Sequence, residues 1–324
     1  MNNNTNTNLN YWLEMLRSPD INERLVAVKT LQHLGDEGAT NALILALKDE
    51  STAVQKIAIT AIWELANPAA VTPLLELLAS PEEEIRSEAL SALGELVSSE
   101  HLLLLLEALQ QQDINLQFNV LILLRKIHHA QTFPFVLRFF ESEYPQLREA
   151  AVTTLRYLNQ VKKCPQALLL LNDPNDNVRR EAALTLGNLV DEAVVALLSK
   201  ALTCDPDWQV RRNAAKSLLL HANSQAIPAI EKALSDEHWQ VRKSAIQVLQ
   251  KIPEAKLLPS LIEALADEYS DVRKEAAIAL GNLANSDLIN ALNKSLDDPD
   301  KEVAIQSRRA IHKIQESIKS STHD

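Results

Sequence analysis

Two stretches of the sequence are nearly the same: Asn177-Val-Arg-Arg-Glu-Ala-Ala-Leu-Thr-Leu-Gly-Asn-Leu189 and Asp271-Val-Arg-Lys-Glu-Ala-Ala-Ile-Ala-Leu-Gly-Asn-Leu283. A third stretch, Gln209 to Leu220, shares their frame. With the residue before Arg as an anchor, the pattern runs along the chain in steps of 31 residues, except for one step of 32. The anchors are Glu23, Val54, Ile85, Leu116, Leu147, Val178, Val210, Val241, Val272 and Val303. A fixed period of this length is the signature of a repeat protein.

Two columns of the repeat indicate a helix after each anchor. The residue eight places on is Leu or Ile in all ten repeats, and the residue four places on is Ala or Ser in nine, with Val120 the exception. Offsets 0, 4, 8 and 11 form one stripe of a helix, so we expect them to be buried. Another apolar stretch precedes each anchor, and pairs such as Asp173-Pro174 and Ser80-Pro81 are typical helix starts. Each repeat therefore reads as helix A, a short turn and helix B.

The sequence predicts an all-α fold, an α-α superhelix (α-solenoid) of about ten 31-residue helix pairs. We expect a single solenoid over residues 9–318, with disordered tails at residues 1–8 and 319–324. Only 5 of the 324 residues are Gly, too few for the tight turns of most sheet and nucleotide-binding folds. An aromatic content of 4% also suits a solenoid better than a conventional globular core.

The overall charge restricts the class of partner. A net charge of −11 repels phosphate backbones and anionic membranes, so we expect neither nucleic acid nor a membrane as partner. The two cysteines, Cys164 and Cys204, form no CxxC motif, and no His cluster has metal-ligand spacing, so we expect no metal site. Met1 to Asn10 lacks the basic and apolar regions of a secretion signal, and we expect a cytoplasmic protein.

The pattern Asp-x-x-x-x-Val-Arg-x-x-Ala-Ala-x-x-Leu-Gly-x-Leu resembles the HEAT-like repeat named after phycobilisome bilin lyases. The resemblance covers about residues 9 to 318; the repeats anchored at Val178, Val241 and Val272 match best, and Gln110 to Gln166 departs most. It implies a HEAT-like solenoid whose B helices line the concave surface. Bilin lyase subunits, phycobilisome degradation factors, deoxyhypusine hydroxylase, a DNA glycosylase family and many scaffolds carry related repeats, so the motif is specific for architecture and not for function.

Two charged columns recur with the same period. Arg follows the anchor at Arg86, Arg148, Arg179, Arg211, Arg242 and Arg273, and Asp precedes it by five places at Asp49, Asp173, Asp205, Asp236, Asp267 and Asp298. A ligand rarely needs the same residue in every repeat. We therefore interpret the two columns as a structural ladder that ties adjacent repeats together, and not as a phosphate site.

Offsets 2, 6 and 10, with the two residues before each anchor, lie opposite the buried stripe and should face a partner. These positions are rich in apolar residues, which usually marks a binding surface. Basic residues gather in the seventh and eighth repeats, whereas acidic residues gather in the third. The predicted partner-binding residues are Phe118, Ile122, Tyr157, Leu184, Trp208, Arg212, Lys216, Trp239 and Lys243. The alternative is that the two Trp rings only cap turns and that the charges are scattered.

The sequence offers no catalytic constellation. It has no His-Glu dipeptide of the kind that binds iron in deoxyhypusine hydroxylase, and neither cysteine has an evident His and acid arrangement. We expect a non-catalytic HEAT-repeat scaffold or adaptor that binds a protein along its concave face, without a cofactor. A phycobiliprotein or another HEAT-repeat subunit is the kind of partner that the resemblance implies. The alternative, implied by the resemblance alone, is a phycobilin lyase-type enzyme subunit, or a phycobilisome-associated chaperone or degradation factor, that transiently binds an open-chain tetrapyrrole.

Overall fold

The computed structural model describes residues 3–283 and 285–321, and every regular element in them is an α-helix or a 3-10 helix. This confirms the all-α prediction of helix pairs. The chain divides into two compact units, Met1–Leu158 and Asn159–Asp324, which are called unit 1 and unit 2 below. Each unit is described by itself. The prediction of a single solenoid over residues 9–318 stays a prediction.

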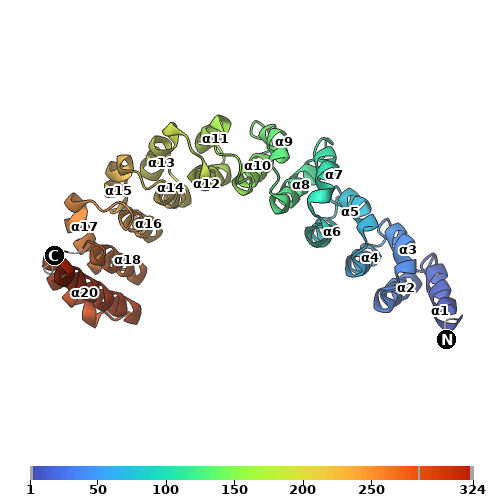
Figure 1. Cartoon of the computed structure of the whole chain (residues 1–324). Coiled ribbons are helices and arrows are strands. Elements are labelled where there is room, and N and C mark those ends of the chain that lie inside the picture. Colours follow the sequence, from blue (N-terminus) through green and yellow to red (C-terminus); the bar gives the residue numbers. More distant parts are fainter. Residues whose placement is uncertain (1–2, 284, 322–324) are drawn as a thin grey trace. The chain divides into compact units, whose positions relative to one another are not determined.

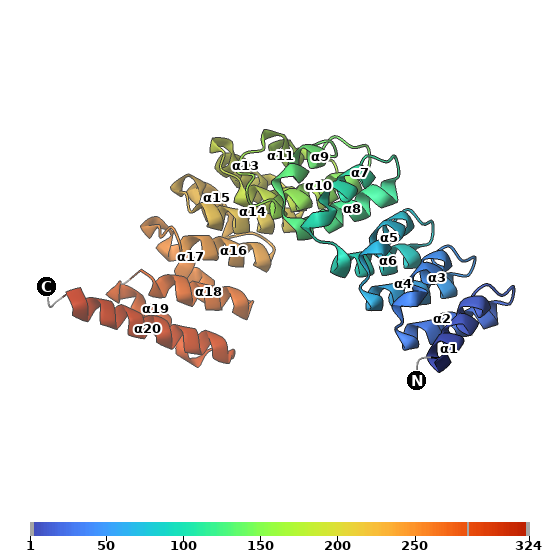
Figure 2. The same cartoon turned by 45° about the vertical axis from the view of Figure 1, so that its right-hand side comes forward.

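Unit 1 consists of five helix pairs (Figure 1). In each pair the odd-numbered helix is helix A and the even-numbered one is helix B. Each B helix packs on the next B helix and on the A helix of its own pair, so the B helices form one layer (Figure 2). The helices are α1 (Asn3–Met15), α2 (Ile21–Leu34), α3 (Thr40–Ala46), α4 (Thr52–Leu65), α5 (Val71–Leu77), α6 (Glu83–Leu96), α7 (Leu102–Ala108), α8 (Ile114–Ile127), α9 (Phe133–Leu137) and α10 (Pro145–Tyr157).

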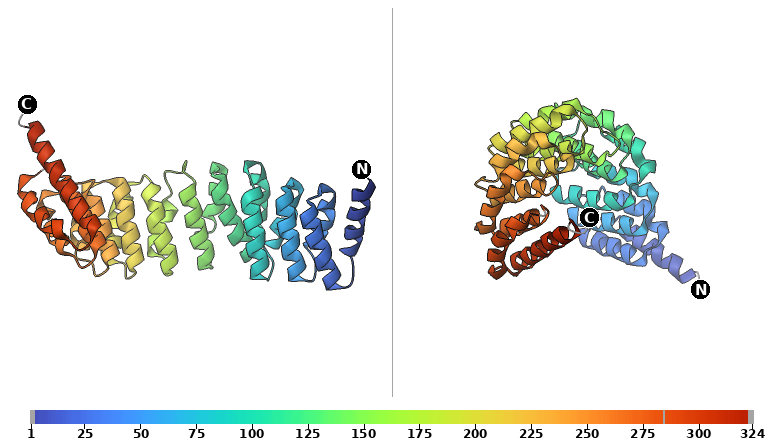
Figure 3. Two further views of the ribbon diagram at one scale, coloured as in Figure 1. Left: turned by 90° about the horizontal axis from the view of Figure 1, so that it is seen from below. Right: turned by 60° about the vertical axis from the view of Figure 1, so that its left-hand side comes forward.

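Unit 2 repeats the same arrangement, with B helices α12 to α20 packed in succession. Its last helix, α20, extends past its neighbours (Figure 3). The helices are α11 (Pro165–Leu169), α12 (Asp176–Thr185), α13 (Glu192–Cys204), α14 (Trp208–His221), α15 (Ile227–Ala233), α16 (Trp239–Leu249), α17 (Leu258–Glu263), α18 (Ser270–Gly281), α19 (Ile289–Asn293) and α20 (Lys301–Ser321).

The repeat pattern explains the core. Nine of the ten anchors, from Val54 to Val303, are at most 3% exposed, and so are the Ala residues four places later in eight repeats. Two positions of the predicted buried stripe are exceptions: the anchor of the first repeat, and the residue eight places after the anchor in the last repeat. Glu23 is exposed, and Ile311 is half-buried because α20 buries Ala310 and Ile314 instead.

The turns explain how each pair closes. Asp36, Asn67 and Asn223 accept a hydrogen bond from the backbone N–H two residues later and begin a 3-10 turn that leads into helix A. Several B helices end in a residue of left-handed conformation, as at Gly35 (φ 56°) and Ala222 (φ 45°). The chain can therefore reverse direction with few glycines.

The disordered tails expected at residues 1–8 and 319–324 stay a prediction. In the described residues, helix α1 begins at Asn3 and contains the buried Leu9. Helix α20 continues through Ser321. The remaining tail residues, 1–2 and 322–324, lie outside the described residues.

Candidate functional site

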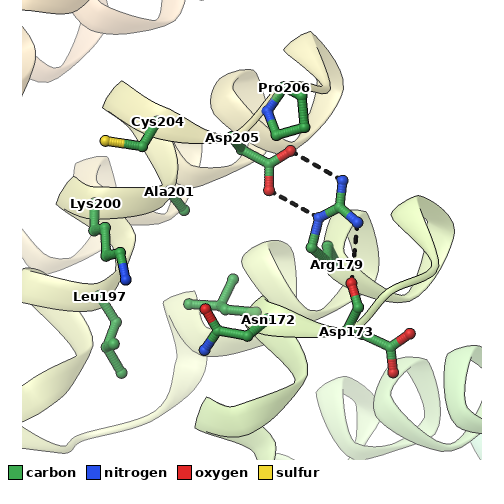
Figure 4. Close-up of a pocket in the computed structure, with 10 residues that line it drawn as sticks. Asn172, Asp173, Arg179, Leu197, Lys200, Ala201, Cys204, Asp205 and Pro206 are labelled. Carbon is green, nitrogen blue, oxygen red and sulfur yellow. Dashed lines mark hydrogen bonds and ion pairs between the residues drawn. The ribbon is translucent and has the colours of Figure 1, made fainter.

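The predicted ladder is present and consists of bidentate ion pairs. The Arg after the anchor donates from Nε and Nη2 to both carboxylate oxygens of the Asp in the following repeat, for instance at 2.7 and 2.8 Å between Arg242 and Asp267. Figure 4 shows the rung between Arg179 and Asp205. The rungs are Arg24–Asp49, Arg179–Asp205, Arg211–Asp236, Arg242–Asp267 and Arg273–Asp298.

Each rung also fixes the turn of its own repeat. Nη1 of Arg273 donates to the carbonyl oxygen of Asp267, six residues earlier, and Oδ1 of Asp298 accepts the N–H of Asp300, two residues later. The hydrogen bond to Asp298 raises the pKa of Arg273, and the same bond lowers the pKa of the Asp298 carboxyl group. Because Nε, Nη1 and Nη2 of each of these arginines all donate hydrogen bonds within the fold, we interpret the described rungs as structural and not as a ligand site.

A hollow of about 320 Å³ lies beside the rung in Figure 4, between the 3-10 turn Leu170–Asn172 and the C-terminal part of α13. Its lining includes Lys200 and the exposed Cys204. The other cysteine, Cys164, is buried, and burial raises the pKa of its thiol. A buried thiol with a raised pKa is a poor nucleophile.

The predicted binding residues of unit 2 gather on the exposed side of α14 and α16, which is called the B-helix face below. Trp208, Arg212 and Lys216 follow each other at intervals of four residues along α14 and so share one side of it. The Arg212 guanidinium carbon lies 5.2 Å from the centre of the Trp208 ring. On the side of the next repeat, the Trp208 ring stacks on His238 at 5.2 Å between centres and 25° between planes.

The next repeat forms the same arrangement. Trp239 stacks on Tyr269 at 5.4 Å and 19°, and the Lys243 ammonium nitrogen lies 5.8 Å from the centre of the Trp239 ring. Both indoles are half-buried, and each packs against the turn that precedes the following B helix. The rings therefore help to join repeats, as the turn-capping alternative expects, while they still lie beside the cations of the predicted surface.

Charge is unevenly compensated on this face. Arg180 pairs with Asp176 and Asp207, and Lys243 and Lys274 share Asp271. Among the described residues, no carboxylate pairs with Arg212 or Lys216. Arg212 donates instead to the amide oxygen of Asn213. Partial burial, followed by the nearby charges of Arg212 and Lys243, lowers the pKa of the Lys216 ammonium group.

The other predicted residues lie apart from this cluster. Phe118 and Ile122, on α8 of unit 1, line a hollow of about 360 Å³ together with Leu90 and Ile114. Tyr157, at the end of α10, is 39% exposed and contacts His128. Leu184 is half-buried on α12, and its carbonyl oxygen is 3.4 Å from Ser217 Oγ of α14.

The residues that hold the Trp rings and the cations in place were not among the predicted site residues. His238 lies three places before the anchor Val241, and Tyr269 lies three places before the anchor Val272. Asp271 lies one place before Val272. Their type varies from repeat to repeat, so the period alone gave no signal. The available signal is the pairing between repeats: His238 follows a repeat whose B helix begins with Trp208, and Tyr269 follows a repeat whose B helix begins with Trp239.

Two other kinds of site, a metal site and a membrane span, concern the described residues. These residues contain no group of three or more His, Cys, Asp or Glu side chains arranged to hold a metal ion. In residues 3–283 and 285–321, no single helix has the length and apolar character needed to cross a membrane. One pair bent by 118°, residues 83–96 with 99–108, meets that test by length and composition alone.

Comparison with solved structures gives the same architecture at low sequence identity. The crystal structure of an engineered protein is 21% identical, with a TM-score of 0.53 over 95% of this chain and 98% of that chain. Yeast importin-β (Kap95p) is 15% identical, with a TM-score of 0.64 over 98% of this chain and 52% of that one. Kap95 in its complex with Nup1 is 16% identical, with a TM-score of 0.66 over 100% and 53%. The chain thus spans about half the length of the importin chains.

The sequence itself matches a family model. No curated protein matches the chain by sequence. The model that describes HEAT repeats matches residues 9–94, 164–250, 196–272 and 258–319, which together are well over half of the chain. The stretch that it leaves unmatched contains most of Gln110 to Gln166, where the repeat pattern is weakest. The bilin lyase branch of such repeats is not singled out by these matches. The chain belongs to the HEAT-repeat family.

Proposed function

We propose that this chain is a non-catalytic scaffold that binds a protein partner on the B-helix face of unit 2. The observation that carries the proposal is the clustering of Trp208, Arg212, Lys216, Trp239 and Lys243 on two neighbouring helices. Trp and Arg are the residue types that contribute most to protein interfaces. Solved structures of Kap95 with similar folds are described in complex with Nup1 and with RanGDP.

The rings suit this role because the fold already orders them. Stacking on His238 and Tyr269 fixes both indoles before a partner arrives, so binding loses little side-chain entropy there. Leu220, on the same helix as Trp208, is 64% exposed and adds apolar surface. A second HEAT-repeat subunit remains one form that the partner can take. We place the scaffold in the cytoplasm, where the free thiol of Cys204 would stay reduced.

Site-specific photocrosslinking tests the proposal. A benzoylphenylalanine replaces Leu220 on the B-helix face in one variant and Leu169 on α11 in the matched control, since both side chains are large, apolar and more than 60% exposed. We expect the Leu220 variant to capture a discrete protein in the source cell, and Trp208→Ala to remove that product. Equal products from both positions, or none from position 220, would contradict the proposed surface.

A second candidate is a bilin lyase subunit or another phycobilisome-associated factor. It is supported by the resemblance of the repeat and by aromatic residues on the B helices, of which Trp63 and Tyr157 are about 40% exposed. An open-chain tetrapyrrole would be held transiently against such rings, next to a phycobiliprotein. Co-expression with a bilin and an apo-phycobiliprotein tests it: visible absorbance bound to the phycobiliprotein supports this function, and its absence favours the scaffold.

A further inference from the structure

Resting on the proposed function, we infer that the partner presents an acidic segment whose side-chain oxyanion is held by Arg212, Lys216 and Lys243, with apolar neighbours against Trp208 and Trp239. This names the chemistry of the partner. The shared recognition element is an oxyanion on a protein side chain, either a carboxylate or a phosphate ester.

The backbone brings the three cations together. Arg212 and Lys216 are one turn apart on α14, where Cβ atoms are separated by about 6 Å. Lys243 occupies on α16 the position that Arg212 occupies on α14, and packed helices lie about 8–10 Å apart. The charges of Arg212 and Lys243 both act on the Lys216 ammonium group, which places all three within electrostatic reach. One oxyanion can therefore approach all three.

The charge balance shows why the site would take an anion. Four basic residues occupy offset 2 in successive repeats of unit 2: Arg180, Arg212, Lys243 and Lys274. Asp176, Asp207 and Asp271 compensate three of them, whereas Arg212 has only the neutral Asn213 and Lys216 is exposed next to it. Uncompensated cations are unfavourable beside each other, so an incoming oxyanion would relieve their repulsion.

The aromatic rings select what accompanies the oxyanion. The Arg212 guanidinium group lies over the Trp208 ring, and the Lys243 ammonium group lies over the Trp239 ring. Each cation is therefore next to apolar surface. A partner residue next to the acidic one would contact that surface. The chain has a net charge of −11, so two cations without a carboxylate partner are a local exception on its surface. A short acidic peptide can reach this local site, whereas a long polyanion such as nucleic acid would be repelled by the rest of the chain.

Fluorescence anisotropy with defined peptides tests the inference. The probe is fluorescein-labelled Glu-Glu-Leu-Glu-Glu-Leu, and its counterpart replaces each Glu with Lys. We expect the full-length protein to bind the acidic probe, and Arg212→Gln/Lys216→Gln to weaken binding by about tenfold, which corresponds to about 1.4 kcal/mol. The matched control is Lys200→Gln/Lys294→Gln, which removes the same charge from exposed positions on the A-helix side of unit 2. It should bind within about twofold of the unchanged protein.

Four further outcomes bear on the inference. Tighter binding of a phosphoserine peptide of equal length, with the same dependence on Arg212 and Lys216, supports the site and identifies the anion as a phosphate ester. Equal losses in the two double variants, or displacement of the probe by oligothymidylate at lower concentration than by the unlabelled peptide, would overturn the inference. If position 220 still crosslinks a protein while the acidic probe fails to bind, the proposed scaffold function stands and only the acidic partner is rejected.

Discussion

The two units are built from the same 31-residue repeat, but they join their repeats differently. In unit 2 the ladder is continuous over four rungs, from Arg179–Asp205 to Arg273–Asp298. In unit 1 the Arg column changes to Gln at Gln55 and Gln117, and the Asp that each would meet changes to Ser at Ser80 and Ser142. At these two rungs both columns change together, so neither leaves a half-buried charge without its partner, whereas Arg86 has Gln111 in place of the Asp and donates to the backbone oxygens of Ser80 and Pro81.

The substituted rungs show that the ladder has two separable roles. Ser80 and Ser142 still accept the N–H two residues later, as the Asp carboxylates do. Gln117 still donates to the carbonyl oxygen six residues earlier, as the Arg Nη1 groups do. At these two substituted rungs unit 1 keeps hydrogen bonds that shape the turn and lacks the ion pair that ties one repeat to the next, whereas the Arg24–Asp49 rung of the same unit keeps that ion pair.

The largest effect is expected when only one partner of an ion pair in unit 2 is replaced by the residue that unit 1 has at that position. Asp267→Ser keeps the turn cap but removes the carboxylate from Arg242, whose side chain is 13% exposed, and should cost about 2–3 kcal/mol of local stability. The double variant Arg242→Gln/Asp267→Ser, which copies unit 1, should lose less than the single one. Urea unfolding followed by fluorescence, in variants that keep only Trp239, measures both. A double variant at least as unstable as the single one would show that the Gln and Ser pair is not a working substitute.

The converse change builds a rung in unit 1. Gln55→Arg/Ser80→Asp should be more stable than the sum of its two single variants by about 1–2 kcal/mol, because each single change adds a charge without a partner. A double-mutant cycle, read from variants that keep only Trp63, gives this coupling energy. A coupling near zero would mean that the repeats of unit 1 are not aligned closely enough for the pair to form.

Acid should affect the two units differently. Hydrogen bonds from Arg273 lower the pKa of Asp298, and hydrogen bonds from Arg180 lower the pKa of Asp207. A carboxyl group whose pKa is lower in the folded state stabilises the fold above its ordinary pKa, and this stabilisation is lost as the pH falls through the lowered value. Below about pH 4, unit 2 should therefore lose stability more steeply than unit 1. Acid titrations of the Trp239-only and Trp63-only variants compare the two units; parallel curves would contradict the ion pairs of Asp298 and Asp207 as the source of the difference.

The sequence predicted the features that repeat. Helix pairs, the buried stripe and the ladder follow from columns such as Val54, Val178 and Val241, where one residue type recurs at one period. The ladder was predicted to tie adjacent repeats together, but the period does not show which atoms of each Arg make that contact. The structure confirms that the pair crosses to the next repeat, and it adds that the Arg meets its own repeat through backbone oxygens.

The candidate site was less predictable because it depends on residues that do not repeat. Trp208 and Trp239 were assigned to the binding face from their column, but their half-burial comes from His238 and Tyr269 in the following repeat. The unequal compensation of charge likewise arises between repeats, since Asp271 lies in the repeat after Lys243. Such contacts depend on the separation between neighbouring helices, which a single repeat does not encode.

The smallest expected effect should be the same in both units, which sharpens the comparison. Ala66 of unit 1 and Ala222 of unit 2 each follow a B helix in left-handed conformation, with φ of 49° and 45°, a region that is unfavourable for Ala and not for Gly. Ala66→Gly and Ala222→Gly should each stabilise by about 0.5 kcal/mol, the strain that is relieved being partly offset by the greater entropy of the unfolded chain. Ala58→Gly, inside α4, is the control and should destabilise instead. Equal gains in stability at positions 66 and 222 would mean that the turns of the two units are alike, and that the units differ in their ion pairs. A gain in only one unit would show that their turns differ as well.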